Sequence, residues 1–497
     1  MAAPLLLTLP GNLLNEIFSL FCGNCAHDPG ACPSLDDKET HEELAARQKV
    51  LASLCRTSKT LKTVAEPHLY HAFSTHDSFF QRHVLFIRSL YERPDLRSYL
   101  RRATFVMHSD ETIMERAVDD LVDDLGPSTP RHPHWQKVKR CRNPESQVDY
   151  MQRKFRHQFL TDAVLSVAEN LQHVAIEGLG NEEFGSGMPA PSRLPALRSL
   201  RLRNLLLGDA TRVCEVADIL PRAPNLRLLE VPGCESVPKD LDLRNLAVLS
   251  IPGPLPEQEC LPELLKTCTN LQAFTLLSPL DGVEGRARPS RDNPDPSLGE
   301  LTLMWLIDAL QPCRESLRYL DVFWEESDLF ARDTPAGLQS FSRLETLIFN
   351  MARICPDILG IDRERHIPLC AIIPPSIRSV LLVACDPEHV RPVMSGLPEK
   401  IRAGQFSDLR EIVIVLDTPT HEEQLSLYLD MREEMREAFQ GTIVSFQVVI
   451  WQLEDEQVFF SDTEALFWGD FGLQVPECLT WSLPAWGTDG PYGGTPV

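Results

Sequence analysis

Apolar and polar residues follow two different periods in different parts of this chain. Near the N-terminus, three short segments carry apolar residues three or four positions apart, the spacing that places them on one face of an α-helix. These residues are Leu13, Leu14, Ile17, Phe18 and Phe21 in the first segment, Leu44, Leu51, Leu54 and Cys55 in the second, and Leu61, Val64 and Ala65 in the third. Helices this short have too little apolar surface for an independent core, so the pattern predicts that their apolar face meets a partner. We expect Pro67 to end the third helix.

A second pattern, of the form L-x-x-L-x-L, recurs from residue 171 onward. Its ten copies begin at Leu171, Leu197, Leu226, Leu246, Leu271, Leu317, Leu344, Ile377, Leu409 and Ile443. The last positions of each copy alternate as they do in a β-strand, with apolar side chains on one side. A strand of this length is not stable alone, whereas stacked neighbours share a continuous core. The starts lie 26, 29, 20, 25, 46, 27, 33, 32 and 34 residues apart.

This spacing indicates an α/β fold built as an irregular leucine-rich-repeat solenoid, or horseshoe, over residues 169–455. Helical patterns lie between the predicted strands, at 211–220, 301–310 and 422–439. An ordinary α/β domain with leucine-rich strands remains the alternative. The 46-residue interval contains a Gly-, Arg-, Pro- and Asp-rich run at 281–293, which reads as a surface loop. We expect a helical linker over 74–168, with helices near 83–91 and 113–125, and a partly disordered tail over 456–497.

Composition narrows the classes of partner. The 497 residues carry a net charge of -23, which argues against a general nucleic-acid-binding protein because affinity for phosphate backbones needs clustered Lys and Arg. The basic stretch between 131 and 156 is more simply a solvated loop. No run of about 18 apolar residues exists, so no membrane span is expected. The 14 cysteines are scattered and no secretory signal is apparent, which favours the cytoplasm, the nucleus or both.

One group of residues has metal-like spacing. Cys22, Cys25, His27 and Cys32 lie close together, and a Cys-x-x-Cys pair with a nearby Cys or His is typical of zinc sites. A second Cys-x-x-Cys pair is missing, so we expect no metal and no cofactor, with zinc at these four residues as the alternative. His41 and His421 are followed by glutamates but lack the second histidine of a zinc-protease helix. No catalytic motif is evident, and we expect a protein without enzymatic activity.

The N-terminal segments resemble the F-box, particularly as it occurs in fungal F-box proteins. The resemblance covers residues 5–73 and rests on the following runs: Leu9-Pro10, Leu13-Leu14, Glu16-Ile17, Leu54-Cys55-Arg56 and Pro67-His68-Leu69-Tyr70. The sequence departs from the pattern in two places. Ser58 stands where a tryptophan is common, and a long insert occupies about 23–48. The resemblance therefore divides the chain into a small all-α F-box module at 1–73 and the repeat array behind it.

An F-box followed by leucine-rich repeats is the layout of substrate receptors in SCF (Skp–cullin–F-box) ubiquitin ligases. The resemblance implies that the F-box binds the Skp adaptor and, through it, the cullin, while the repeats bind an unknown target protein. The residues it implies for adaptor contact are Leu9, Pro10, Leu13, Leu14, Ile17, Leu51 and Leu54. Some of them must pack the module itself. The alternative function is a repeat scaffold without a link to ubiquitination, whose N-terminal helices merely cap the array.

Overall fold

The computed structural model describes the chain in segments. They are residues 9–22, 25, 38–75, 80–106, 160–177, 193–203, 219–231, 241–252, 260–278, 303–324, 336–350, 368–385, 387–416 and 422–450. The chain forms two compact units, Met1–Asn245 and Leu246–Val497. Twelve strands within the described residues lie in chain order in a parallel sheet, β1–β5 in the first unit and β6–β12 in the second. The predicted α/β class is therefore confirmed.

The first unit begins with three helices, α1 (Gly11–Ser19), α2 (Lys38–Thr57) and α3 (Lys59–Leu69). Together they enclose a small core of Leu14, Phe18, Leu51, Leu61 and Ala65. We refer to residues 9–71 as the N-terminal module. Ser58 separates α2 from α3, and its hydroxyl caps α3 by accepting a hydrogen bond from the Leu61 N–H at 3.1 Å. The serine that replaces the expected tryptophan thus has a structural role here.

Two helix boundaries differ from expectation. Helix α2 starts at Lys38, so it takes up the last part of the insert predicted at 23–48. Helix α3 continues through Pro67 to Leu69, and the Tyr70 N–H still reaches the carbonyls of Glu66 and Pro67. A proline inside a helix removes its own N–H from the hydrogen-bond ladder and crowds the carbonyl four residues earlier, and α3 ends within one turn of Pro67.

The sheet of the first unit contains five strands. They are β1 (Ala72–Ser74), β2 (Arg102–Val106), β3 (His173–Glu177), β4 (Ser199–Arg203) and β5 (Leu228–Glu230). Helices α4 (Phe80–Glu92) and α5 (Pro94–Arg97) connect β1 to β2, and a short 3-10 helix, η3 (Leu220–Arg222), precedes β5. The strands are in register, with Ala103, Val174, Leu200 and Leu229 side by side in one buried row.

The first two strands lie in the region that the sequence assigned to the end of the F-box and to a helical linker. The parallel sheet therefore begins at residue 72, well before the predicted array start at 169. Leu100, Ala103 and Phe105 keep the repeat spacing and are buried, but alanine and phenylalanine replace two of the leucines. Thr75 joins the two strands: its hydroxyl donates to the Val106 carbonyl at 3.1 Å and accepts from the Val106 N–H at 2.6 Å.

The second unit contains the other seven strands. They are β6 (Val248–Pro252), β7 (Ala273–Ser278), β8 (Tyr319–Trp324), β9 (Thr346–Asn350), β10 (Ser379–Cys385), β11 (Glu411–Leu416) and β12 (Ser445–Ile450). The second apolar position of each repeat aligns with the next across the strands. The aligned residues are Leu249, Phe274, Leu320, Leu347, Val380, Ile412 and Phe446.

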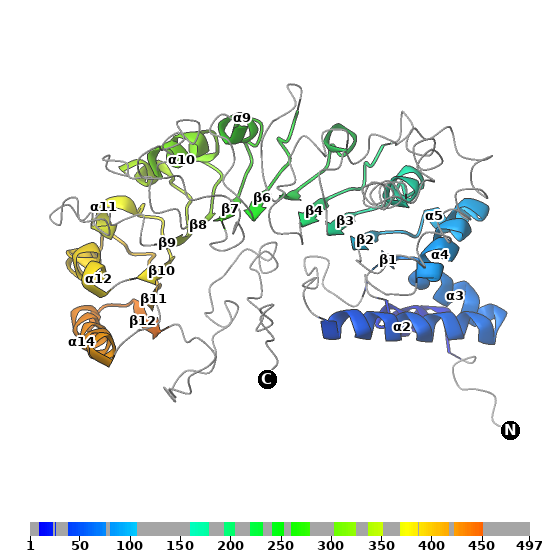
Figure 1. Cartoon of the computed structure of the whole chain (residues 1–497), viewed down its shortest axis with the longest axis horizontal. Helices are drawn as coiled ribbons and strands as arrows, with labels where there is room; N and C mark the ends of the chain where they lie inside the picture. The colour runs from blue at the N-terminus through cyan, green and yellow to red at the C-terminus, as the bar shows by residue number, and fades with distance from the viewer. Residues whose placement is uncertain are drawn as a thin grey trace, which may run out of the picture. The chain divides into compact units, whose positions relative to one another are not determined.

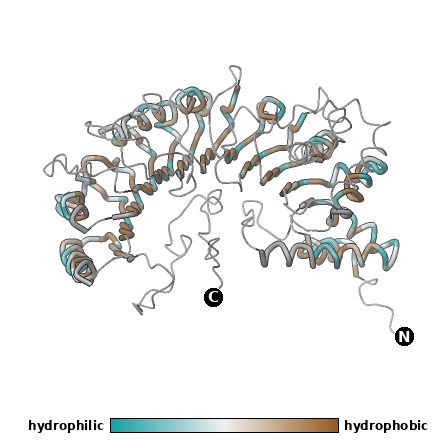
Figure 2. Tube along the Cα trace, viewed as in Figure 1, coloured by the Kyte–Doolittle hydropathy of each residue, from teal (hydrophilic) through white to brown (hydrophobic). Residues whose placement is uncertain are grey.

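Helical segments of this unit lie on one side of its strands (Figure 1). They are α9 (Cys260–Lys266), α10 (Leu303–Leu310), η4 (Gln311–Cys313), η5 (Ala336–Ser340), α11 (Leu369–Ile372), α12 (Pro387–Met394), α13 (Leu397–Arg402) and α14 (Glu422–Phe439). Apolar residues are concentrated along the strands and on the inner faces of the helices (Figure 2). Each strand and its helical segment thus contribute one layer to a shared core.

The ten predicted strand positions all coincide with strands, β3 to β12. The helices expected at 301–310, 422–439 and 83–91 match α10, α14 and α4. The predictions at 113–125, 211–218, 281–293 and 456–497 lie outside the described residues. Among the described residues, no helix combines the length and apolar character that crossing a membrane requires.

Candidate docking surface and metal centre

The seven residues proposed for adaptor contact separate into three groups in the N-terminal module. Leu14 and Leu51 are buried in the core that the three helices share. Leu9, Ile17 and Leu54 are half-buried and pack against that core. Pro10 is exposed, and Leu13 keeps 41% of its surface exposed although it lies next to a core residue in the sequence. Only the last two groups have atoms available for a partner.

The module exposes two further apolar side chains that the sequence pattern did not select. Leu20, directly after α1, is 65% exposed, and Val50 of α2 is 40% exposed. Among the described residues, the large apolar side chains that are exposed are Leu13, Leu20, Val50, Leu85 and Ile443. Three of these five belong to the module. Leu20 lies seven positions after Leu13 and three after Ile17, which is the spacing of one helical face, so helical period could have selected it.

Polar and aromatic contacts connect the module to the start of the sheet. Arg93 donates two hydrogen bonds to the Glu66 carboxylate of α3, at 2.6 and 3.1 Å. These bonds lower the pKa of Glu66. The Gln48 side-chain amide donates to the Ala72 carbonyl at 3.2 Å. The Tyr70 ring stacks on Phe86 of α4 with a centroid distance of 5.1 Å. The module is therefore joined to the first layer of the sheet.

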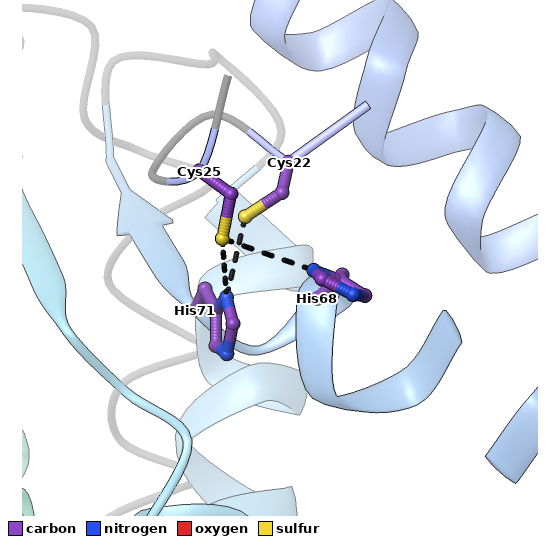
Figure 3. Close-up of side chains that lie close together, drawn as sticks. All are labelled: Cys22, Cys25, His68 and His71. Carbon is purple, nitrogen blue, oxygen red and sulfur yellow. Dashed lines mark hydrogen bonds between the residues drawn. The ribbon is translucent and has the colours of Figure 1, made fainter. Parts of the chain in front are cut away.

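Four metal-ligating side chains converge at one end of the module, as Figure 3 shows. Cys22 and Cys25 lie in a turn after α1, His68 lies in the last turn of α3, and His71 follows that helix. The ligand atoms of the four side chains all lie within 4.8 Å of one another. His71 Nδ1 is 3.4 Å from Cys22 Sγ and 3.2 Å from Cys25 Sγ, and His68 Nδ1 is 3.9 Å from Cys25 Sγ.

Local backbone structure positions these residues. The N–H groups of Leu20, Phe21 and Cys22 each bond to a carbonyl three residues earlier, which carries the chain in tight turns from α1 to Cys22. The Cys25 N–H then bonds to the Cys22 carbonyl at 3.1 Å and turns both thiols toward α3. On the other side, His68 and His71 are three residues apart at a helix end, so both rings can reach the same point.

Burial and hydrogen bonding make this an unusual environment for thiols. Cys22 and His68 are buried, His71 is half-buried and Cys25 is exposed. Hydrogen bonds from Cys22, His68 and His71 lower the pKa of the Cys25 thiol to about 2, against the opposing effect of its partial burial. The side chains around Cys25 therefore favour its thiolate, which is the form that binds metals.

The structure brings together only part of the metal site that the sequence suggested. Cys22 and Cys25 lie at the centre of the cluster, whereas His27 and Cys32 are outside the described residues. His68 and His71 take part instead, and sequence reasoning missed them. A signal was present: the His-x-x-His spacing mirrors Cys-x-x-Cys. The two pairs are far apart in the sequence, since His68 is 43 residues from Cys25, and only the fold brings them together.

Charged groups are also buried in the sheet, at positions between the repeat leucines. Arg201 of β4 and Glu230 of β5 pair in register, with Arg201 Nε 3.6 Å from Glu230 Oε2. In the second unit, burial raises the pKa of Asp321 on β8 to about 7. The Tyr319 hydroxyl donates to Asp321 Oδ2 at 3.4 Å. Neither pair forms a nucleophile-and-base arrangement, and both are better explained as parts of the packed sheet.

No protein-family model matches the sequence, and a search of curated proteins finds no match either. The function must therefore be argued from the geometry of the module, its exposed apolar side chains and the sheet behind it.

Proposed function

We propose that this chain is the substrate-recognition subunit of an SCF-type ubiquitin ligase. In this proposal the N-terminal module is an F-box that binds the Skp adaptor and, through it, the cullin. The parallel layers form an irregular leucine-rich-repeat horseshoe that binds a target protein. The chain itself breaks and forms no covalent bond. It raises the effective concentration of target lysines near the ubiquitin-loaded enzyme.

The observation that carries the proposal is the exposure of apolar side chains on a module that already has its own core. Leu14 and Leu51 are buried within that core, so they stabilise the module and are not available to a partner. Leu13, Leu20 and Val50 nevertheless remain exposed. Leu13 and Leu20 are seven positions apart, about two helical turns, so they lie on the same side of α1, and adjoining exposed apolar side chains are typical of interaction sites. Their position in the segment that resembles an F-box supports a Skp adaptor as the partner.

The sheet supports the second half of the proposal. Ten of its strands carry the L-x-x-L-x-L pattern, and neighbouring strands pair in parallel with the leucines in register. A stack of this kind gives an extended surface on which each layer contributes a few side chains. Such surfaces suit the binding of a protein rather than a small molecule.

The proposal is tested by capture of the full-length chain on a purified Skp adaptor. The informative variant is Leu13→Asp, because this side chain is exposed and its replacement leaves the module's core intact. The matched control is Leu85→Asp, since Leu85 is also exposed, at 56%, but belongs to α4 outside the module. We expect Leu13→Asp to weaken binding at least about tenfold and Leu85→Asp to leave it unchanged. The proposal would be contradicted if the wild-type chain did not bind the adaptor, or if both variants weakened binding to the same extent.

The contacts between the module and the sheet favour a second candidate, a repeat scaffold with an N-terminal cap. Helix α3 leads directly into β1, and Arg93 and Phe86 hold it there. A cap protects the first layer of a repeat array and needs no partner. In that case a wild-type chain that is folded and binds a target would form no complex with the adaptor and cullin in size-exclusion chromatography.

A further inference from the structure

We propose that Cys22, Cys25, His68 and His71 bind one zinc ion, which fastens the end of α1 to the end of α3. This inference concerns the N-terminal module alone. It holds whether the module docks on an adaptor or caps the array.

The spacing of the ligand atoms supports a tetrahedral site. Zinc–sulfur bonds of about 2.3 Å and zinc–nitrogen bonds of about 2.0–2.1 Å place sulfur and nitrogen ligands about 3.6 Å apart in a tetrahedron. The observed sulfur–nitrogen distances of 3.2, 3.4 and 3.9 Å lie on both sides of this value. The four ligand atoms form one compact group, so a single ion can reach all of them after small side-chain rotations.

An outer contact orients one ligand for metal binding. His68 Nε2 lies 3.0 Å from Asn15 Oδ1. The amide oxygen carries no hydrogen, so the proton of this bond belongs to Nε2. With the proton on Nε2, the ring can give the lone pair of Nδ1 to a metal ion in place of its contact with Cys25, the residue that this atom faces (Figure 3). Histidine ligands of metals generally have their second nitrogen fixed in this way.

The donor set selects the metal and its role. Two thiolates and two imidazoles suit zinc, whereas magnesium and calcium require oxygen ligands. Two thiolates also neutralise the charge of a divalent ion, which matters because Cys22 and His68 are buried. Four protein ligands leave no position for a water molecule or a substrate. The site is therefore structural rather than catalytic.

The location explains what the ion would contribute. The core of the module contains only a few buried apolar residues, and small modules commonly need a metal or a disulfide to remain folded. The ion would close a long loop that contains α2, from Cys25 to His68. The His71 carbonyl accepts the N–H groups of Arg101 and Arg102, so the same ligand also belongs to the first layer of the sheet. Zinc at this point would hold the helices and the sheet edge together.

The test measures metal content of the full-length chain, purified with a reducing agent, supplied with zinc and then freed of unbound metal. We expect about one zinc per chain by elemental mass spectrometry. Cys25→Ser and His71→Ala should each reduce the bound zinc several-fold. Cys55→Ser is the matched control, because this thiol lies in the same module outside the cluster, and it should retain the zinc.

A second measurement uses the unaltered chain, so it does not depend on whether a variant folds. Cobalt in place of zinc should give the intense visible absorption of a tetrahedral ion and a near-ultraviolet band from thiolate ligands. A weak octahedral spectrum would overturn the proposal. So would a reduced wild-type chain that takes up no zinc, or bound zinc that is unchanged in both Cys25→Ser and His71→Ala. A Cys22–Cys25 disulfide that survives reduction and excludes zinc would overturn it as well.

Discussion

His68 Nε2 and Asn15 Oδ1 lie 3.0 Å apart, so a residue of α1 fixes the ring orientation of a residue at the end of α3. If His68 is a zinc ligand, Asn15→Ala should weaken zinc binding by roughly 10- to 100-fold, because the ring loses its fixed orientation. Competition with a chromophoric chelator measures this change. Asn12→Ala is the control, since Asn12 is exposed on the same helix. Equal affinities of the two variants would show that the Asn15 contact plays no part in metal binding.

The Arg93–Glu66 ion pair should stabilise the junction between the module and the sheet modestly. Arg93 is 40% exposed, so solvent screening limits its coupling to Glu66 to about 1 kcal/mol or less. The lowered pKa of Glu66 means that this contribution is present above its unfolded pKa and is lost as the pH falls through the folded value. A double-mutant cycle of Glu66→Gln and Arg93→Gln, followed by urea unfolding at pH 7 and at a series of lower pH values, measures it. A coupling energy that does not decrease as the pH falls would contradict this account.

Asp321 should make the second unit less stable as the pH rises. Its pKa is raised to about 7 by burial, so the folded state holds the proton more tightly than the unfolded state. The free energy of unfolding contributed by this group is therefore highest below about pH 4. It falls by an amount on the order of 4 kcal/mol as the pH rises to 7.

Asp321→Asn removes this titration and keeps the size of the side chain. We expect the urea midpoint of the variant to rise relative to wild type between pH 5 and pH 8. Asp308→Asn, an exposed position on α10, serves as the control and should follow the wild-type curve. A constant difference between Asp321→Asn and wild type at all pH values would contradict the expected sign.

Gly337 of η5 is required by close packing rather than by backbone conformation. A Cβ atom at this position would overlap Cγ2 of Ile307 in α10. Gly337→Ala should therefore destabilise the second unit by about 1–3 kcal/mol, as expected for overpacking. At Gly11, no atom lies within 4 Å of an added Cβ. Gly11→Ala should be neutral or slightly stabilising in the same denaturation assay. A comparable loss at both positions would indicate a general effect of alanine.

Alanine substitutions at Leu51 and Leu13 should distinguish a residue that stabilises the module from one that is available to a partner. Leu51 is buried in the module's core, so Leu51→Ala should cost about 2–5 kcal/mol of module stability. Leu13 is exposed, and Leu13→Ala should change stability by less than about 0.5 kcal/mol. Hydrogen exchange of the peptides that cover α1 and α3 measures both effects. Faster exchange in Leu13→Ala than in Leu51→Ala would reverse the assignment of core and surface.

The strands of the sheet could largely be predicted from the sequence, because the last two apolar positions of L-x-x-L-x-L are two residues apart and both are buried in every copy before the last. Leu200, Leu320 and Val380 are examples. The first two strands, β1 and β2, could not be predicted in this way. In β2, Ala103 and Phe105 occupy the leucine positions, and β1 has only three residues. The core tolerates alanine and phenylalanine at these positions, because packing depends on the total volume buried in a layer more than on the residue type.

The sequence by itself determined the helical and strand periods, the order of the elements and the Cys-x-x-Cys pair. Only the tertiary structure decided which apolar residues of the module face its core, because Leu13 and Leu14 are adjacent and equally hydrophobic. It alone also placed His68 and His71 beside Cys22 and Cys25. Local periodicity reports contacts between near neighbours. Cys25 and His71 are 46 residues apart in the sequence. Whether they meet depends on how α1 packs against α3, which no local pattern encodes.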